Sequence, residues 1–289
     1  YDLMFEALGP GALTLDGKAW KEARARYQPQ FFHQAIEEVL PTIRSTIQGH
    51  CSKYSAQSFS LNDMIAPIIT EVMLSVLCGV SSKEYASITT PILQLANKEI
   101  SRFSPFIRPI SKRKKLQKGL SEMHQCLLSM APKFSPQAML GPLIEGFNQQ
   151  SISEAAFLGE LKNFLIAGAE TTSSTLAWAF YNLTTHSDAY TKICHEIRHA
   201  SPPDKWLGAS LPYTQHCLEE TMRLYPSIWT ILRKSILTHQ FGDIKIKKNQ
   251  RIKLCPYTLN RHQEYRDKPL KLNPERFKYH NKQMEPKNN

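Results

Sequence analysis

Small and polar residues interrupt an apolar stretch near the middle of the chain. The segment at 164–172 reads Phe-Leu-Ile-Ala-Gly-Ala-Glu-Thr-Thr. Gly168 lets another group approach the backbone closely, and the hydroxyl of Thr171 can bond to a carbonyl one turn earlier and bend a helix. Glu170 adds an acid, so this notch could bind water or relay protons. The segment also fits a buried helix with a small-residue crossing point, and by itself it leaves both interpretations open.

A helix must carry these residues. Before the notch, the segment 151–154 (Ser-Ile-Ser-Glu) predicts a capping box, in which Ser151 accepts a backbone N–H and Glu154 reaches back. Apolar residues then recur with the period of a helix at Phe157, Leu158, Leu161, Phe164 and Leu165. We therefore expect a helix whose apolar face runs directly into Gly168 and Thr171.

A second constellation closes another helical stretch. Glu220 and Arg223 are three residues apart, so they share a helix face and can form an ion pair. Pro226 stops that helix. Further on, the segment 274–277 (Pro-Glu-Arg-Phe) supplies another arginine beside an aromatic ring. An isolated pair at this spacing is usually a solvated surface pair that contributes little.

An aromatic residue and an arginine stand one turn apart near the start of the chain. Trp20 is followed four residues later by Arg24. On a helix the two side chains can stack, or both can donate hydrogen bonds to one anion. The pair is therefore a candidate anion site.

In this order the four motifs resemble those of the cytochrome P-450 family, the haem-thiolate monooxygenases. The family pattern is Trp-x-x-x-Arg, then Ala/Gly-Gly-x-Asp/Glu-Thr-Thr, then Glu-x-x-Arg, then a Pro-Glu-Arg-Phe-like tetrad, and all four stand in this sequence. The resemblance runs from about Gly17 to Phe277. It implies a mainly α, cytochrome P-450-like fold with a small β element, incomplete, as a single partial domain over residues 1–289.

The resemblance also implies roles for individual residues. Thr171 matches the distal threonine of the family and Glu170 its acidic neighbour, a catalytic pair that helps deliver protons to bound oxygen. The buried structural triad of the family corresponds to Glu220, Arg223 and Arg276. Haem contacts are expected at Trp20, Arg24, Ala167, Gly168 and Arg233. Substrate contacts are expected at Phe164, Ile228, Trp229, Thr230 and Ile231, although apolar residues there could equally be ordinary core.

One family signature is missing from the sequence. The Phe-x-x-Gly-x-Arg-x-Cys-x-Gly loop, whose cysteine thiolate is the axial iron ligand, should follow the tetrad, but no cysteine follows Phe277. The six cysteines neither stand in that context nor pair at metal-ligand spacing: Cys51, Cys78, Cys126, Cys194, Cys217 and Cys255. The N-terminal sheet and first helices of the family are missing as well. The sequence is interpreted as an interior or truncated fragment, expected to be inactive as it stands for want of the axial cysteine.

The function implied by the resemblance is a haem-dependent monooxygenase that inserts one oxygen atom from O2 into an apolar organic substrate. Its partners would be O2, the apolar small-molecule substrate, and a ferredoxin or flavoprotein reductase as electron donor. The alternative is a non-catalytic remnant, or a helical protein whose basic surface binds an acidic partner or anionic lipid. That alternative accounts for the missing cysteine but not for the ordered motifs.

The composition favours a basic surface. The 289 residues include 36 Lys and Arg against 25 Asp and Glu, a net charge of +11. The basic clusters at 112–115 and 245–253 are of a kind that is most often solvated, but such clusters also attract acidic partners and anionic membranes. Nucleic-acid binding is unsupported, because no aromatic residues alternate with these clusters.

The cysteines and the hydropathy bear on location. Cysteines without a disulfide pattern suggest a reducing compartment. No uncharged apolar stretch is long enough to span a bilayer. We expect a cytoplasmic location, or the cytoplasmic face of a membrane if an N-terminal anchor precedes these residues.

The remaining pattern is mostly helical. Periodic apolar residues predict helices at 20–45, 61–77 and 189–199. Pro29 and Pro41 are potential breaks in the first of them. Residues 133–146 are expected to form a linker, and 244–254 a short hairpin with its turn at 248–250.

Overall fold

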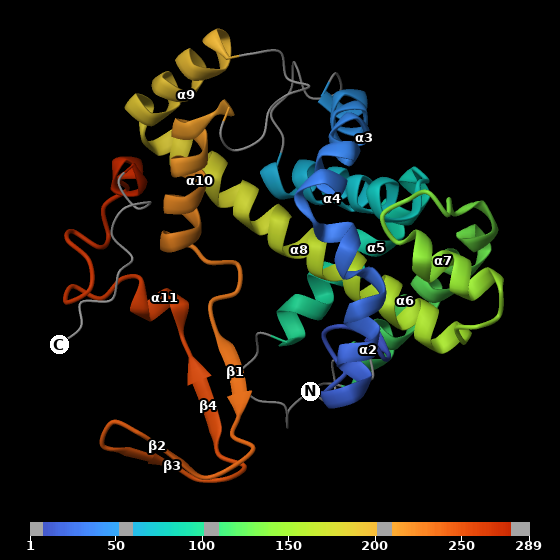
Figure 1. Ribbon diagram of the computed structural model, residues 1–289. Helices are drawn as coiled ribbons and strands as arrows, with labels where there is room; N and C mark the ends of the chain where they lie inside the picture. The colour runs from blue at the N-terminus through green and yellow to red at the C-terminus, as the bar shows by residue number, and fades with distance from the viewer. Residues whose placement is uncertain (1–7, 52–59, 101–109, 201–209, 279–289) are drawn as a thin grey trace. The chain divides into compact units, whose positions relative to one another are not determined.

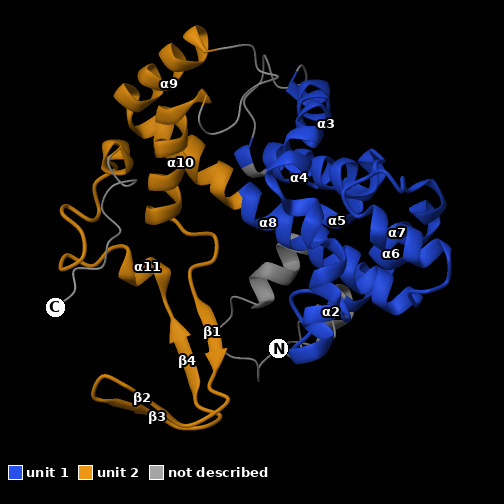
Figure 2. Ribbon diagram, in the orientation of Figure 1, with its two compact units in different colours: residues 1–173 blue, residues 174–289 orange. Residues whose placement is uncertain are grey.

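The computed structural model describes residues 8–51, 60–100, 110–200 and 210–278, and most of them are helical (Figure 1). The predicted mainly α fold with a small β element is confirmed. The chain divides into two compact units, residues 1–173 and 174–289 (Figure 2). The boundary falls within the long helix α8, so α8 contributes residues to both units. A single partial domain over 1–289 remains a prediction.

The regular elements in the described part of unit 1 are all helices. Its elements are α2 (Gly17–Tyr27), η1 (Gln28–Phe31), α3 (His33–Cys51), α4 (Leu61–Cys78), α5 (Lys83–Ile100), α6 (Ile110–Met130), η3 (Ala131–Lys133), α7 (Gly141–Asn148) and the first part of α8 (Glu154–Thr185). The basic run at 112–115 begins α6, but its side chains lie outside the described set.

The core of unit 1 is made of leucine and aromatic side chains from several helices. Leu77 of α4, Leu127 of α6, Leu143 of α7 and Leu161 of α8 are almost fully buried in one cluster. Burying such a side chain contributes roughly 1.5–3 kcal/mol. The apolar residues of α8 that recur with the period of a helix lie in this cluster. The predicted apolar face of α8 is therefore confirmed.

The structure corrects three predictions that rested on the positions of prolines and serines. The predicted helix at 20–45 is divided by η1, which contains Pro29, whereas α3 continues through Pro41. Part of the predicted linker is helical, because α7 begins at Gly141 with a proline in its first turn, where the missing N–H costs nothing. The capping box is wrong by two residues: the Ser153 hydroxyl accepts the Ala156 N–H at 3.3 Å, while Ser151 bonds back to the preceding turn.

The segment before α2 is held on α8 by buried polar groups. Glu160 accepts the N–H of Ala12 at 3.0 Å, and Asn163 accepts the N–H of Leu13 at 2.9 Å. A side chain at Gly159 would meet the Pro10 carbonyl oxygen at 2.0 Å, so only glycine permits this approach. Burial raises the pKa of the Glu160 carboxyl. These contacts fix the segment that leads into α2 on α8.

A buried polar relay joins three other parts of unit 1. His50 at the end of α3 lies 2.7 Å from a carboxylate oxygen of Glu71 on α4, and the Ser81 hydroxyl donates to the other oxygen. His50 is 8% exposed and Glu71 4%. Burial by itself would raise the pKa of Glu71, but the hydrogen bonds from Ser81 and His50 outweigh it and hold the pKa below its usual value.

Unit 2 combines the end of α8 with further helices and short strands. Its elements are α9 (Ser187–His199), α10 (Pro212–Leu224), β1 (Ile231–Lys234), β2 (His239–Phe241), β3 (Ile244–Ile246), β4 (Arg251–Leu254), α11 (Pro256–Leu259) and η6 (Pro274–Phe277). The predicted helices at 61–77 and 189–199 are confirmed as α4 and α9.

The strands form two antiparallel pairs, and the predicted hairpin is wrong in its pairing. β1 pairs with β4, and β2 pairs with β3, so the two strands predicted to face each other have different partners. The predicted turn is nevertheless present, because the Gln250 N–H donates to the Lys247 carbonyl at 3.0 Å. Alternating apolar residues identify a strand but not its partner.

The start of α10 is capped from α9. The carboxylate of Glu196 accepts the N–H of Tyr213 at 2.6 Å and the N–H of Thr214 at 2.8 Å. A carboxylate there satisfies two of the N–H groups that a helix start leaves unpaired and favours the positive end of the helix dipole. This contact anchors the helix that carries Glu220 and Arg223.

Length and composition bear on membrane spanning. Among the helices of the described ranges, none by itself is long and apolar enough to cross a membrane. One bent pair of helical segments, Asp63–Cys78 with Lys83–Ile92, reaches the required length and apolarity when the two segments are taken together.

We expect the buried relay to matter far more than a comparable surface pair. His50→Ala leaves Glu71 buried with a partner lost and should lower the free energy of unfolding by about 3–5 kcal/mol. His33→Ala removes the exposed His33–Glu37 pair and should cost less than about 1 kcal/mol. Urea unfolding measures the free energy of unfolding of both variants. Equal losses would contradict the prediction that the buried pair contributes more than the exposed one.

The relay also predicts an acid sensitivity. Because the folded pKa of Glu71 is lowered, its contribution to stability is complete above the unfolded value of about 4.3 and is lost as the pH falls through the lower folded value. Glu71→Gln should therefore be less stable than the native chain at neutral pH, with a smaller difference in acid. Urea midpoints of both proteins, measured from neutral pH into acid, test whether the difference in stability shrinks as the pH falls.

Candidate functional site

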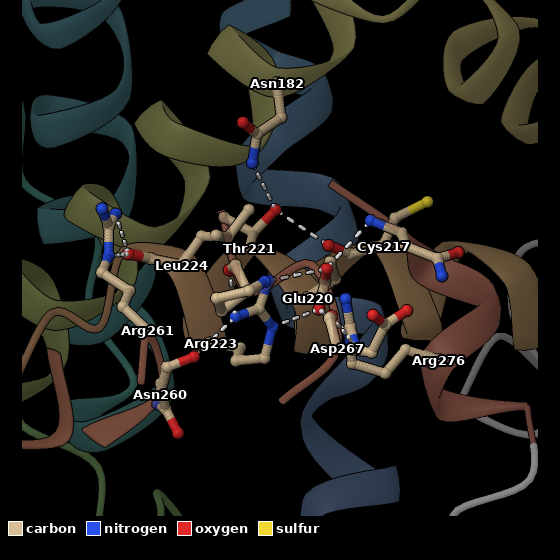
Figure 3. Close-up of polar contacts among 12 residues, drawn as sticks. Asn182, Cys217, Glu220, Thr221, Arg223, Leu224, Asn260, Arg261, Asp267 and Arg276 are labelled. Atoms are coloured by element: carbon tan, nitrogen blue, oxygen red, sulfur yellow. Dashed lines mark hydrogen bonds and ion pairs between the residues drawn. The ribbon is translucent and has the colours of Figure 1, made fainter. Parts of the chain in front are cut away.

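Glu220 and Arg223 form a fully buried ion pair on α10 (Figure 3). Arg223 donates Nε to one carboxylate oxygen at 2.6 Å and Nη2 to the other at 2.9 Å, a bidentate fork. Arg276 of η6 approaches the same carboxylate at 3.5 Å. Glu220 is 0% exposed and Arg223 4%. The three residues predicted as a triad therefore lie together, and the pair is buried rather than solvated.

Backbone groups complete the network. Arg223 Nη1 donates to the carbonyls of Asn260 and Pro269, each at 2.8 Å, and the N–H of Asn273 donates to Glu220 at 2.9 Å. These three backbone groups come from the irregular segment between α11 and η6, so all three guanidinium nitrogens of Arg223 and both carboxylate oxygens of Glu220 have a partner. A buried ion pair is stable only when its remaining hydrogen-bonding capacity is filled in this way.

Two polar residues that the sequence did not single out extend this network. Asn182 of α8 is 3% exposed and donates to the hydroxyl of Thr221 at 3.0 Å. Arg261 donates to the carbonyl of Leu224, the last residue of α10, and its guanidinium lies 4.0 Å from the centre of the Tyr257 ring. The lone asparagine within an otherwise apolar helical stretch was the available signal for Asn182.

The notch of α8 is built into an unbroken helix of 32 residues. The Thr171 hydroxyl donates to the carbonyl of Ala167 at 2.7 Å, the predicted bond to the preceding turn. A side chain at Gly168 would meet the Met73 methyl carbon at 2.1 Å, so the group that approaches this glycine is a methionine of α4. Glu170 and Thr171 are half-buried. Their catalytic roles remain predictions.

The residues expected to bind the haem carboxylates are surface residues of their own units. In unit 1 the Arg24 guanidinium lies 5.7 Å from the centre of the Trp20 ring, so the pair is brought together on α2, and Trp20 is 36% exposed. In unit 2 Arg233 lies on β1, is exposed, and donates Nη1 to the Leu232 carbonyl at 3.0 Å.

The predicted substrate residues fall into two groups. In unit 1 Phe164 packs edge-on against Tyr27 at 4.6 Å and stacks on Phe31 at 5.5 Å. Burial, followed by the negative charge of Glu160, raises the pKa of Tyr27 to about 12. In unit 2 the four remaining positions run from an exposed loop into β1: Ile228 and Trp229 are exposed, and Thr230 and Ile231 are half-buried.

The residues present fit part of a haem. Trp20 and Arg24 present an indole N–H and a guanidinium fork from one helix, which suits a carboxylate. The sequence holds no counterpart of the axial cysteine loop. Cys255, the cysteine nearest the tetrad in sequence, donates to the Trp229 carbonyl at 3.4 Å, and a hydrogen bond with Thr258 lowers the pKa of its thiol. The donor set therefore fits haem carboxylates but does not supply the iron thiolate.

Comparison with known proteins agrees with the fold. The sequence model of the cytochrome P450 family matches residues 4–289. Cytochrome P450 4d1 of Drosophila melanogaster is 25% identical over 331 residues, which cover 94% of this chain and 64% of that protein. Cytochrome P450 3A16 of Mus musculus is 25% identical over 303 residues, which cover 91% and 60%. A solved structure, the retinoic acid-bound cyanobacterial CYP120A1, superposes with a TM-score of 0.82 at 19% identity, covering 96% of this chain and 66% of that one.

The chain belongs to the cytochrome P450 family, because the family model matches nearly all of it. The resemblance carried by the four motifs is thereby confirmed, and haem is the cofactor of this family. The chain spans less than two-thirds of the length of the curated relatives named here.

The buried pair predicts a large and non-additive effect of substitution. Arg223→Met strands the Glu220 carboxylate and should lower the free energy of unfolding by about 3–5 kcal/mol. Adding Glu220→Gln should recover part of the loss, since the two residues are coupled. The control is Lys18→Met, which removes the exposed Lys18–Glu22 pair at a cost below about 1 kcal/mol. Additive losses in urea unfolding would contradict the coupling.

Proposed function

We propose that the protein to which these residues belong is a haem-dependent monooxygenase, which inserts one oxygen atom from O2 into an apolar organic substrate. The observation that supports this most directly is the notch of α8, where Thr171 lies one turn beyond Ala167 and next to Gly168 and Glu170, in a chain of the cytochrome P450 family. A ferredoxin or a flavoprotein reductase supplies the electrons, attracted by the basic surface.

Haem, when bound, supplies the oxygen-activating chemistry. On the protein side, Trp20 and Arg24 of unit 1 and Arg233 of unit 2 would each contact a haem carboxylate. The support for these roles is chemical: each arginine is exposed and offers a planar fork that matches a carboxylate. The cation–π contact pre-positions Arg24 and reduces the rotamer freedom lost on binding.

Thr171 moves protons at its Oγ1 atom. A hydroxyl is donor and acceptor at once, so it can receive a proton from one side and pass one to the other. Glu170, its neighbour in sequence, is the acid that replenishes the proton. Ala169 and Leu165 are each 2% exposed, so the helix that carries the notch is firmly packed on another face.

The substrate is apolar. Phe164 contributes a ring from α8, and Ile228, Trp229 and Ile231 contribute apolar surface from the loop after α10 and from β1. Burying such side chains against an apolar molecule is the main source of affinity in small-molecule pockets. Thr230 Oγ1 donates to the Leu254 carbonyl at 3.3 Å, so its role is to fix this loop on β4.

The missing axial cysteine predicts a spectroscopic difference. Residues 1–289 should be inactive, and with haem, reductant and carbon monoxide they should lack the red-shifted Soret band of thiolate-ligated haem. A reading frame extended beyond Asn289 should encode the Phe-x-x-Gly-x-Arg-x-Cys-x-Gly loop, and its product should show the band. The band in residues 1–289 that Cys255→Ser abolishes would make Cys255 the ligand. An extended frame without the loop would leave a non-catalytic remnant, the rival function.

The proton role of Thr171 predicts a selective loss in the extended protein. Thr171→Ala should lower the rate of substrate oxidation by about a hundred-fold, whereas Thr171→Ser retains the hydroxyl and most of the rate. Thr172→Ala, at the exposed neighbouring position, is the matched control. The carbon monoxide spectrum should be the same in all variants, which separates proton delivery from haem binding. Equal rates for Thr171→Ala and Thr172→Ala would exclude the role.

A further inference from the structure

Helix α9 carries two histidines one turn apart on its exposed side. His195 and His199 are four residues apart, so they share a helix face, and both are exposed. Their rings stack with centres 4.2 Å apart and planes inclined by 27°. The buried residues of α9, Ala189 and Ile193, lie on another face. The histidine pair therefore points away from the packed side of α9, toward solvent.

A hydrogen bond selects the protonation form of one ring. Nδ1 of His199 lies 2.7 Å from the carbonyl oxygen of His195, and because a carbonyl oxygen only accepts, Nδ1 carries the proton. In a neutral imidazole this leaves Nε2 with a free lone pair. Histidines that bind metals are held in the same way, since the nitrogen that does not bind the metal donates to a carbonyl, a carboxylate or water. His199 is thus prepared to bind a metal through Nε2.

The separation of the two rings suits a single metal ion. A metal bound to two imidazole nitrogens at about 2.0–2.1 Å each holds those nitrogens no more than about 4 Å apart. Stacked rings with centres 4.2 Å apart reach this separation by rotation about their side-chain bonds, without a change in the helix backbone. Two histidines four residues apart on one helix face supply zinc ligands in metalloproteases for the same geometric reason.

We propose that His195 and His199 form a chelating site for a divalent transition metal ion of the kind that imidazole binds well, such as Ni²⁺, Cu²⁺ or Zn²⁺. In the described ranges no group of three or more His, Cys, Asp or Glu side chains is placed to hold one metal ion, so water completes the coordination here. Catalytic zinc centres use three protein ligands. A site with two protein ligands holds an ion without being a second reaction centre.

The position of the pair gives the bound ion a structural effect. A metal that joins residues 195 and 199 closes the last turn of α9, where a helix otherwise frays. Glu196 stands within that turn, and its carboxylate caps the start of α10 through the N–H groups of Tyr213 and Thr214. Figure 1 shows α9 beside α10, and both belong to unit 2. The bound ion therefore stabilises unit 2 against unfolding, independently of the proposed oxidation chemistry.

Titration with Ni²⁺ tests the proposal with the native chain. Ni²⁺ binds imidazole firmly and does not oxidise thiols as Cu²⁺ does, which matters because Cys51 is exposed. Calorimetry should show one tightly bound ion per chain, and Ni²⁺ should raise the urea midpoint. His195→Gln and His199→Gln should each lower the affinity at least about ten-fold, since loss even of an outer partner of a metal ligand costs that much. The double variant should bind no more weakly than either single variant, because one imidazole alone does not chelate.

A rescue variant controls for the geometry. Thr191 is exposed and lies one turn before His195. Thr191→His combined with His199→Gln restores two histidines four residues apart and should recover the affinity for Ni²⁺. His33→Ala, at an exposed histidine of α3 in unit 1, should leave the binding unchanged. The substituted positions of α9 are exposed, so these variants should keep the metal-free urea midpoint of the native chain.

Three results would overturn the proposal. Equal affinity of the native chain and the double variant would place the ion elsewhere on the molecule, and an absence of Ni²⁺ binding would exclude the site altogether. Additive losses from the two single variants, with no recovery in the rescue variant, would show two separate imidazoles that bind an adventitious ion only, and not one chelate.

Discussion

The buried pair between Glu220 and Arg223 is the constraint to which the rest of unit 2 conforms. Removing two ions from water costs several kcal/mol for each, and the attraction between them offsets this only if every remaining donor and acceptor is filled. The side chains of α10 cannot fill them alone. The carbonyls of Asn260 and Pro269 and the N–H of Asn273 do so, and this requires the irregular segment between α11 and η6 to lie against α10. This segment, which has little regular structure, thereby follows one defined path.

The same helix is then held along its length. Glu196 satisfies N–H groups at its first turn, Asn182 bonds to Thr221 in its middle, and Arg261 satisfies the carbonyl of its last residue, Leu224. Because both ends and one side are hydrogen-bonded, α10 has little freedom to rotate or shift. The loop that leaves it toward β1 therefore starts from a defined point, which is what a candidate substrate and haem-contact segment requires.

The sequence predicted what depends on local spacing and missed what depends on distant partners. A helical period located α4, α8 and α9, and three-residue spacing predicted the ion pair of α10, since both are read along a single helix. The predicted pairing of β3 with β4 was wrong, since β3 pairs with β2, because alternation does not name a partner. The carbonyl partners of Arg223 are 37 and 46 residues away and carry no side-chain signal, so only the fold reveals them.

The arginines illustrate why motif and environment must be considered together. By residue type Arg24, Arg223 and Arg233 are alike, and only the resemblance assigns Arg223 to the structural triad and the other two to haem contacts. In the structure Arg223 commits Nε and both terminal nitrogens to protein oxygens and is 4% exposed, so it has no capacity to bind a carboxylate from outside. Arg24 and Arg233 are exposed, with the former lying over an indole ring. Saturation by protein acceptors marks the arginine that maintains the fold, and exposure beside a rigid neighbour marks those suited to an anionic ligand.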